Sequence, residues 1–579
     1  MSQLNHQKSY LIVLGLITLI LASCLLVAFV LNQDAGRVNV STVTIPAGDF
    51  TVSGLLYEPL VAGLSPGVVL MHGVSNSKEV LSGFALELAK QGIVALTIDA
   101  LGHGESGGTL DQGRSADPSL GMVAAYGWLG DHSSVDPTLI GVMGHSMGGS
   151  AAVEAVQVVD PKAVVLLGGG LFNSSVDPLV LNVTHPRNLL VVIGEQDVLF
   201  DLEVVKEDLL PSVFGQAGPI KSGVTYGSFV TNTARRLATP TTSHLFEPVT
   251  PAVVGEVTDW FVQAFGVPSQ GTSQSFLFRD LALVVSLVLF VSALLPLSSV
   301  VLVLTNHFLP PSQNQSLPSG MLVSSWLVMG FWGIIGLVLF LPALLFFGSY
   351  VPIPPLYFGS SFAWWLFLVG LVGLLVLFMW GERIHQSLSR EHLLPFLRSQ
   401  VCLADVVVGV LVVAVAFAAV SVVEWALVLN FRLVVPLIQT SGQLGRYLAF
   451  VSFVPFSLFF FFVEGLVIHR IREDPQDPSK DNVGPFSSWL LALAVKNIPY
   501  IALLLLFYIP LFALGFSVVP GQLGFFVEFL VLVVPIFLIS TTYSWWLYRQ
   551  SGRVGAGAVV NGLLVAWLAS ALFPLMTIG

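Results

Sequence analysis

The residues best suited to do chemistry lie in one short stretch, Gly144–Gly149, which reads G-H-S-M-G-G. An apolar run at 139–143 precedes it, and an alanine-rich run at 150–158 follows it, so the pattern predicts a strand, a sharp turn and a helix. Glycines on both sides allow the backbone to turn tightly and a substrate to approach closely. This G-x-S-x-G pattern is typical of a nucleophilic serine, and we predict that role for Ser146.

A serine hydroxyl is a weak nucleophile and needs two further side chains to activate it. A base must lie within hydrogen-bond reach, and a carboxylate must hold that base in the correct tautomer. Asp197 follows a predicted strand at 189–193, which places it at the carboxyl edge of a sheet, where such sites collect. Glu195 and Asp201 are near enough in the sequence to compete for this role. We predict Asp197 as the orienting acid.

The scaffold for these residues is predicted from alternating short apolar strands and helical stretches between about residues 38 and 274. Residues 42–45 and 51–57 alternate between apolar and polar types, as in an antiparallel pair at a sheet edge. Further strands are expected at 67–71, 93–98, 139–143, 163–167, 189–193 and 237–239, and helices at 79–91 and 251–265. Strands buried on both faces with helices between them predict an α/β fold with a mostly parallel sheet.

Four more stretches carry a family resemblance. They are V-L-M-H-G-V at 69–74, I-D-A-L-G-H-G-E-S at 98–106, V-I-G-E-Q-D at 192–197 and T-S-H at 242–244. With them, the segment from about 40 to 266 resembles an α/β-hydrolase of the dienelactone hydrolase or serine-aminopeptidase-like branch. The nucleophile, the acid and the histidine occur in the order that this fold requires.

The resemblance implies the remaining roles. His244 precedes the final predicted helix, the usual place of the general base in this family, so it completes a triad with Ser146 and Asp197. Two backbone N–H groups should stabilise the oxyanion that develops on the substrate. By the family pattern these belong to Val74, directly after His72-Gly73, and to Met147, directly after the nucleophile.

The composition places most of the chain in lipid. Of the 579 residues, 55% are hydrophobic and only 10% are charged, whereas a soluble domain carries about 25% charged residues. The net charge of −11 is concentrated in the polar segment, which argues against nucleic acid as a partner. Cys24 and Cys402 lie in or beside apolar runs and suggest neither a disulfide framework nor a metal site.

Apolar runs of spanning length predict three parts: an amino-terminal anchor at 1–37, the hydrolase-like domain at 38–274 and a membrane domain at 275–579. The anchor run extends from Tyr10 to Leu31 and lacks a convincing cleavage site, so we expect it to be retained. Eight later runs are expected at 281–304, 321–348, 362–380, 403–429, 447–468, 487–515, 523–547 and 555–577.

The distribution of lysine and arginine in the short loops predicts the orientation. With the amino terminus in the cytoplasm, that side receives Lys8, Arg383, Arg390, Arg398, Arg470, Arg472, Lys480, Arg549 and Arg553. The opposite side receives Arg37, Arg279, Arg432 and Arg446 near the membrane. We therefore expect an integral protein of the cell membrane with an extracytoplasmic hydrolase-like domain.

Several ionisable residues fall within or near the apolar runs, where an unpaired charge costs several kcal/mol. They are Asp405, Glu424, Glu464, Lys496 and Glu528. Glu424 and Glu528 should lie near the hydrolase-like domain as substrate-binding candidates, or else reach the interface. Glu464 and Lys496 could form a structural ion pair. Arg235 and Arg236 lie in the long connection between Asp197 and His244 and could bind an anionic head group.

Two classes of function compete. The first is a membrane-embedded serine hydrolase that cleaves an ester or amide of a lipid-like or membrane-proximal substrate through an acyl-enzyme, with a peptidase as a variant. The second is a transporter or channel-like protein whose hydrolase-like domain binds or gates. No metal cluster or phosphate-binding loop of known spacing occurs in the sequence, so we expect no cofactor; the bilayer is the expected partner.

Overall fold

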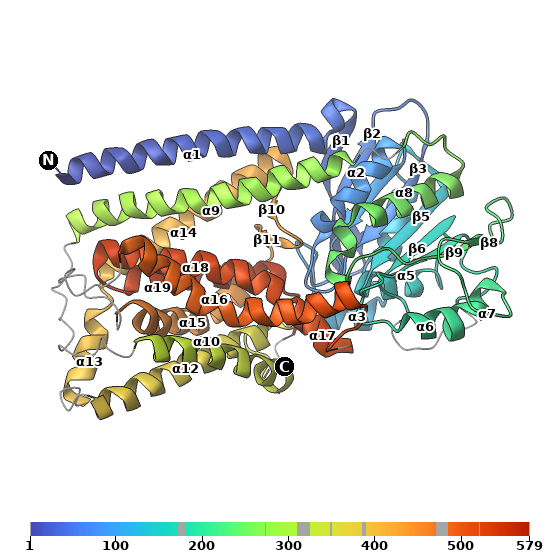
Figure 1. Ribbon diagram of the computed structural model, residues 1–579. Helices are drawn as coiled ribbons and strands as arrows, with labels where there is room; N and C mark the ends of the chain where they lie inside the picture. The colour runs from blue at the N-terminus through green and yellow to red at the C-terminus, as the bar shows by residue number, and fades with distance from the viewer. Residues whose placement is uncertain are drawn as a thin grey trace.

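The computed structural model describes residues 2–171, 180–271, 274–309, 325–347, 350–384, 390–470, 484–519 and 521–577. The chain forms a sheet-containing half and a helical bundle that lies against one end of it (Figure 1). The bundle combines the first helix with the residues that follow Ser275. The segments that form it are thus separated in sequence by the whole sheet-containing half.

The first half is organised around a sheet with the strand order β1-β2-β4-β3-β5-β6-β7-β9-β8. The strands are β1 (Val38–Ala47), β2 (Phe50–Pro59), β3 (Ser65–Met71), β4 (Val94–Ile98), β5 (Val135–His145), β6 (Ala163–Leu167), β7 (Leu189–Val192), β8 (Thr225–Tyr226) and β9 (Arg235–Ala238). β1 and β2 form an antiparallel pair at one edge, and β2 is antiparallel to β4. The six strands from β4 to β9 in this order are parallel to their neighbours, and β8 closes the other edge antiparallel to β9. The predicted α/β fold with a mostly parallel sheet is confirmed.

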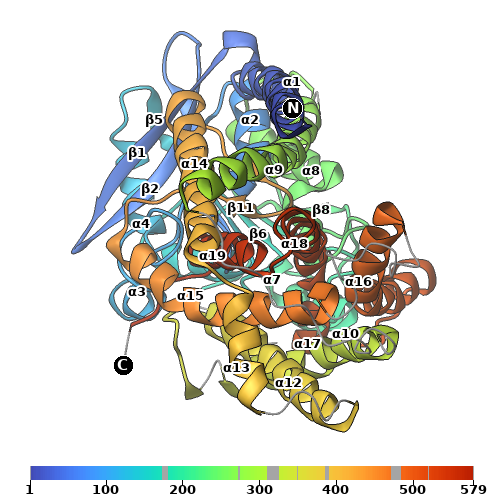
Figure 2. The ribbon, with the colours of Figure 1, turned by 90° about the vertical axis from the view of Figure 1, so that its left-hand side faces the viewer.

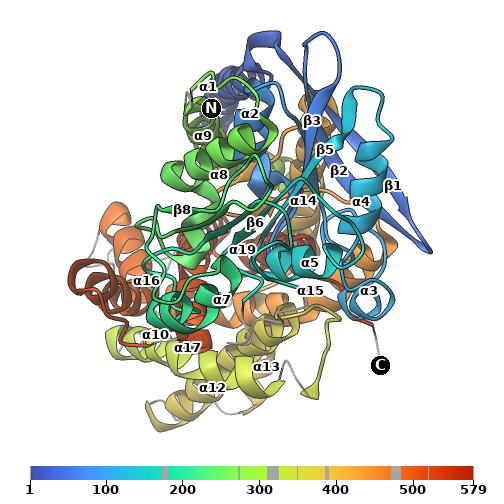
Figure 3. The ribbon, with the colours of Figure 1, turned by 90° about the vertical axis from the view of Figure 1, so that its right-hand side faces the viewer.

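Helices cover both faces of the sheet because alternate strand residues point to opposite sides. On β3, Val69 and Met71 join one buried cluster, and Val68 and Leu70 join the other. The helices of this half are α2 (Ser82–Lys90), α3 (Leu110–Ala116), α4 (Met122–Gly130), α5 (Met147–Ala155), α6 (Leu202–Val204), α7 (Leu210–Phe214) and α8 (Pro251–Phe265). Helices α2 and α8 lie on one face, and α4 and α5 on the other (Figure 3).

The second half is a bundle of long apolar helices. They are α1 (Ser2–Asn32), α9 (Ser275–Phe308), α10 (Ser325–Pro342), α12 (Gly359–Ile384), α14 (Leu403–Leu427), α15 (Leu444–Gly465), α16 (Pro485–Ile509), α17 (Gly521–Glu528), α18 (Leu530–Ser551) and α19 (Gly555–Leu572). The short helix α13 (Arg390–Ser399) and the two-stranded pair β10 (Phe431–Arg432) and β11 (Pro436–Ile438) connect them. Seen end-on, α1 and α9 lie together at one side of the bundle, with α12 and α13 at the other (Figure 2).

Eight helices of the described chain are long and apolar enough to cross a membrane, and they make this a membrane protein. They lie at Gln7–Asn32, Ser275–Phe308, Gly359–Leu377, Leu403–Leu427, Leu444–His469, Pro485–Leu514, Gly521–Ser551 and Gly555–Leu572. The run predicted at 321–348 corresponds to α10 (Ser325–Pro342) and the helical turn Ala343–Phe347 that continues it, and its stretch Gly330–Phe346 is apolar. Residues 321–324 and the charges Arg472 and Lys480 lie outside the described residues.

The bundle docks on the carboxyl edge of the sheet. Arg446 of α15 donates to the carbonyls of Gly102 and Gly104 in the sheet half, and to those of Ser570 and Phe573 at the end of α19. The backbone of Leu575 accepts from Leu110 N at 2.8 Å and donates to Gly102 O at 2.9 Å. The loops that carry a parallel-sheet active site are therefore in direct contact with the membrane helices.

Candidate active site

Ser146 sits on the turn between β5 and α5 in a strained conformation, with φ 53° and ψ −115°. A non-glycine residue with positive φ is uncommon, and such strain collects at functional sites. The turn needs glycine at its flanks, because a Cβ at Gly144 would lie 1.9 Å from the carbonyl oxygen of Gly148. A Cβ at Gly148 would lie 2.4 Å from the carbonyl oxygen of Met71 on β3. The predicted strand, turn and helix are present.

The structure brings Ser146, His244 and Asp197 together at the carboxyl edge of the sheet. His244 Nε2 lies 3.0 Å from Ser146 Oγ, and His244 Nδ1 lies 2.7 Å from Asp197 Oδ2. Asp197 follows β7, and His244 opens the short helical turn His244–Val249 that follows β9. All three side chains are buried. Asp197 accepts the proton on Nδ1, which leaves Nε2 free to take the proton of the Ser146 hydroxyl.

The pKa of His244 results from two opposing effects. Burial lowers the pKa of the imidazole, whereas the Asp197 carboxylate and its hydrogen bond raise it, with a smaller upward contribution from Glu528. The net direction is upward from the ordinary value of histidine. An imidazole with a raised pKa binds the serine proton more firmly once transfer has begun, as a general base must.

The two predicted oxyanion donors lie close to Ser146. Met147 is the first residue of α5 and follows Ser146 directly. Val74 follows Gly73, and a Cβ at Gly73 would lie 3.0 Å from Ser146 Cβ, so this turn is in contact with the nucleophile. His72 holds the turn in place, with Nδ1 bonded to Gly73 O at 2.6 Å and Nε2 accepting from Ala100 N at 3.2 Å.

Glu247 belongs to the site but was not predicted. Its Oε1 accepts from Gly194 N at 2.7 Å, and its Oε2 lies 3.4 Å from His145 Nε2. Burial and the negative charge of Asp197 raise the pKa of Glu247 well above that of an ordinary carboxyl group. The position three residues after His244, within one helical turn, was the only sequence signal for it.

His145, His244 and Glu247 have ligating atoms within 4.8 Å of one another, which is a spacing that could hold a metal ion. His244 is already bonded on both ring nitrogens to triad members. Burial lowers the pKa of His145 and raises that of Glu247. Because both ring nitrogens of His244 are bonded to Ser146 and Asp197, we assign His145 and Glu247 to the buried surroundings of these residues and not to a metal site.

Helix α17 of the bundle covers the triad. Gly521 N donates to Val198 O at 2.8 Å, next to Asp197, and Glu528 accepts from Leu245 N at 3.3 Å, next to His244. Between these ends, the ring of Phe525 meets the ring of His244 edge-on, with centroids 5.3 Å apart. Glu528, a substrate-binding candidate from the sequence, is therefore buried beside His244.

Replacing Glu528 with glutamine is expected to shift the acid limb of the pH profile of kcat/KM to lower pH. That limb reports the pKa of the free enzyme's base, and removing the negative charge removes one contribution that raises it. Glutamine retains an oxygen that can accept from Leu245 N. The matched control is Glu203→Gln on the exposed helix α6, which should leave the limb in place. An unmoved limb in Glu528→Gln would show that this carboxylate does not act on His244.

Arg235 and Arg236 lie away from the triad, so their positions do not support the predicted role in head-group binding. Arg235 pairs in register with Leu189 at the beginning of β7, at the opposite edge of the sheet from Asp197. Its buried guanidinium donates to the carbonyls of Asn182 and Ala234. Arg236 forms a 2.8 Å ion pair with Glu256 and bonds Thr225. Both arginines therefore hold the far end of the sheet together.

The other ionisable residues of the bundle have partners within the chain. The carboxylate of Glu424 accepts from the backbone and hydroxyl of Thr440, away from the triad. Lys496 forms a 2.7 Å ion pair with Glu464 and donates to Ser540 Oγ at 2.9 Å. These contacts favour the structural interpretation of the Glu464 and Lys496 pair.

Residues 65–199 match the sequence model of the family described as serine aminopeptidase, S33. One similar curated protein is an uncharacterized protein of Mycobacterium tuberculosis, 29% identical over 143 residues, which are 23% of this chain and 50% of that protein. A second uncharacterized protein of the same organism is 34% identical over 125 residues, which are 21% of this chain and 34% of that protein. The chain thus spans about half or less of the length of these relatives.

Similar solved structures include a dienelactone hydrolase from Anabaena variabilis, with 23% identity and a TM-score of 0.28, covering 39% of this chain and 98% of that one. An esterase from the archaeon Pyrobaculum calidifontis has 17% identity and a TM-score of 0.31, covering 44% and 94%. The family match over residues 65–199 and the strand order together support an α/β-hydrolase fold for the sheet half, which confirms the resemblance in the sequence. The chain combines this domain with a set of membrane-spanning helices.

Proposed function

We propose that this protein is a membrane-embedded serine hydrolase that cleaves an ester or amide bond of a lipid-like or membrane-proximal substrate. The observation that carries the proposal is the continuous hydrogen-bonded series from Ser146 Oγ through His244 to Asp197, with a membrane helix packed on the histidine. A hydrolase that acted only on soluble substrates would have no need to turn this edge of its sheet toward the bundle.

The geometry assigns a role in the reaction to Ser146, to His244 and to the two backbone N–H groups. Ser146 Oγ attacks the substrate carbonyl carbon while its proton passes to His244 Nε2, and the N–H groups of Val74 and Met147 stabilise the oxyanion. His244 then gives that proton to the leaving oxygen or nitrogen as its bond to the carbonyl carbon breaks, which leaves an acyl group on Ser146. A water molecule then attacks the acyl carbon while the same imidazole takes its proton. The imidazole returns this proton to Ser146 Oγ as the bond between Oγ and the acyl carbon breaks, which releases the free acid.

A fluorophosphonate probe tests the nucleophile directly, because it forms a covalent bond only with an activated serine. We expect the purified full-length protein to be labelled at Ser146 and Ser146→Ala to remain unlabelled, as mapped by mass spectrometry. Ser150→Ala, on the same helix one turn later, is the matched control and should be labelled like the wild type. If the wild-type protein is not labelled at Ser146, the proposal of a serine hydrolase is wrong.

The proposed orientation places the hydrolase domain outside the cytoplasm. Its support is the excess of lysine and arginine in the loops assigned to the cytoplasmic side. A cysteine placed at the exposed Asp131, in a background with Cys24 and Cys402 replaced by serine, should react with a membrane-impermeant maleimide in intact cells. A cysteine at Asp131 that reacts only after lysis would reverse the orientation.

A further inference from the structure

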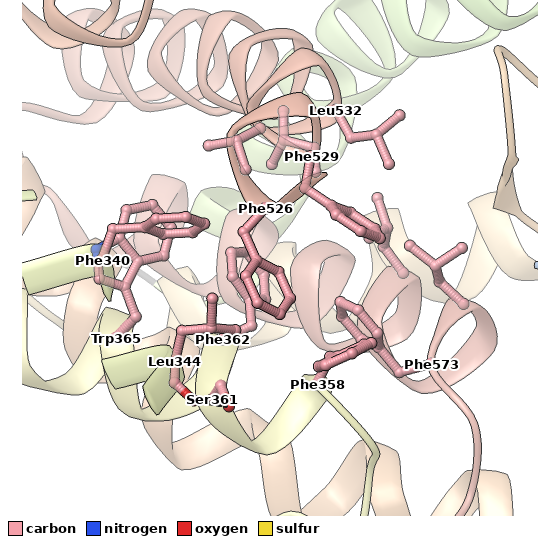
Figure 4. A pocket seen from close by; sticks show the side chains of 14 residues that line it. Phe340, Leu344, Phe358, Ser361, Phe362, Trp365, Phe526, Phe529, Leu532 and Phe573 are labelled. Atoms are coloured by element: carbon pink, nitrogen blue, oxygen red, sulfur yellow. Dashed lines mark hydrogen bonds between the residues drawn. The ribbon is translucent and has the colours of Figure 1, made fainter. Parts of the chain in front are cut away.

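The bundle contains an apolar cavity directly behind helix α17. It is lined by fourteen residues that lie in α10, α12, α17, α18 and α19, in the turn after α10, or directly beside the ends of α12, α17 and α19. Its volume is about 70 Å³. Thirteen of these side chains are apolar or aromatic, and Ser361 is the exception. The close-up shows carbon on nearly every side of the space, with the rings of Phe358, Phe526, Phe529 and Phe573 around it (Figure 4).

The cavity and the triad share one helix. Phe525 contacts the ring of His244, and the next residue, Phe526, lines the cavity. Phe529 also lines it, and its ring centroid lies 5.1 Å from that of Phe525. A single aromatic ring therefore separates the catalytic imidazole from the wall of the cavity.

Such a space is unusual in a folded interior, which is packed as densely as an organic crystal. Apolar cavities in proteins stay dry and bind apolar ligands. Since a water molecule requires about 10 to 15 Å³ in this measure, the cavity has room for roughly five groups of that size. This suits a segment of a hydrocarbon chain. With no ionisable residue among the fourteen that line it, the cavity does not suit a charged head group.

Resting on the proposed function, the geometry points to this cavity as the binding site for the acyl chain of the substrate, with its carbonyl at Ser146 and its chain passing Phe525. The substrate class is thereby a lipid ester with an acyl chain long enough to pass from the triad into the bundle. Short esters bind with their carbonyl at Ser146 but do not reach the cavity. The hydrolase thus takes its acyl specificity from the membrane helices.

The test compares 4-nitrophenyl esters of two, four, eight and twelve carbons in detergent, with the full-length protein. Val533→Phe and Ser361→Phe fill the cavity and should lower kcat/KM for the eight- and twelve-carbon esters at least 10-fold, leaving the two-carbon ester within twofold. The matched control is Ala414→Phe, in a separate cavity between α14, α15 and α19, which should change neither. The proposed acyl site would be overturned if both variants kept the wild-type dependence of kcat/KM on chain length. An equal loss of kcat/KM for all four esters would also overturn it.

A second measurement separates this inference from the proposed function. Lauric acid carrying a diazirine near its methyl end is cross-linked to Ser146→Ala, and the modified residues are mapped by mass spectrometry. Adducts at Phe526 and Phe529 that disappear in Val533→Phe support the acyl site, whether or not the fluorophosphonate labels the wild type. Adducts confined to the outer surface of the bundle overturn it, even for a protein whose Ser146 is reactive.

Discussion

Alanine in place of Ser146 is expected to lower kcat for an ester substrate by about 10⁴- to 10⁶-fold, and a second alanine at His244 to cost almost nothing more. The two side chains act as one unit, since the 3.0 Å contact between Oγ and Nε2 is the route of the proton. Once the nucleophile is lost, the base has no proton to accept. The residual rate comes from substrate binding and the oxyanion donors.

The measurement is kcat of the two single variants and the double variant, with folding checked by the thermal unfolding midpoint in detergent. Ser150→Ala serves as the control for a serine on the same helix and should retain wild-type kcat. Losses that multiply in the double variant would show that Ser146 and His244 act independently, which the geometry does not allow.

Methionine in place of Lys496 is expected to destabilise the bundle by about 3 to 5 kcal/mol, because it leaves Glu464 buried without its counter-charge. The two side chains are 2% and 1% exposed, and their nitrogen and oxygen lie 2.7 Å apart. Replacing both residues, as in Glu464→Met with Lys496→Met, removes both charges together. The double variant should therefore regain most of the lost stability.

This prediction is checked by thermal unfolding in detergent, where Lys496→Met should unfold several degrees below the double variant. Lys206→Met is the matched control, since it breaks an exposed pair with Glu203 and should change stability by less than about 1 kcal/mol. The double variant should retain hydrolysis under the structural interpretation. Loss of hydrolysis in a stable double variant would instead assign the pair a part in function.

The strand, turn and helix around Ser146 could be predicted from the sequence because each signal was local. The glycines around Ser146 are dictated by backbone contacts within the turn and with β3, so they can be recognised without the rest of the fold. The register of β5, β6 and β7 follows from short apolar runs buried on both faces. Asp197 and His244 then follow from their positions after strands of that sheet.

What could not be predicted depends on contacts between distant segments. Arg235 lies in the right connection for a head-group ligand, yet the register of β9 against β7 places it at the wrong end of the sheet. Glu528 was a candidate because it lies in an apolar run of the sequence. Only the packing of α17 against the sheet half shows that its carboxylate accepts a hydrogen bond from Leu245 N. Glu247 looks like any turn residue until Gly194 and His145 are packed against it.

The guanidinium of Arg446 ties the hydrolase-like half to the bundle. It is 4% exposed and binds carbonyls from both halves, so neither half can be exchanged without leaving polar groups dry and unsatisfied. A hydrolase domain attached only by a membrane anchor would not need an arginine that binds carbonyls of both halves. A fragment cut between the two halves would therefore leave the carbonyls of Gly102 and Gly104, beside the candidate site, without the donor that binds them here.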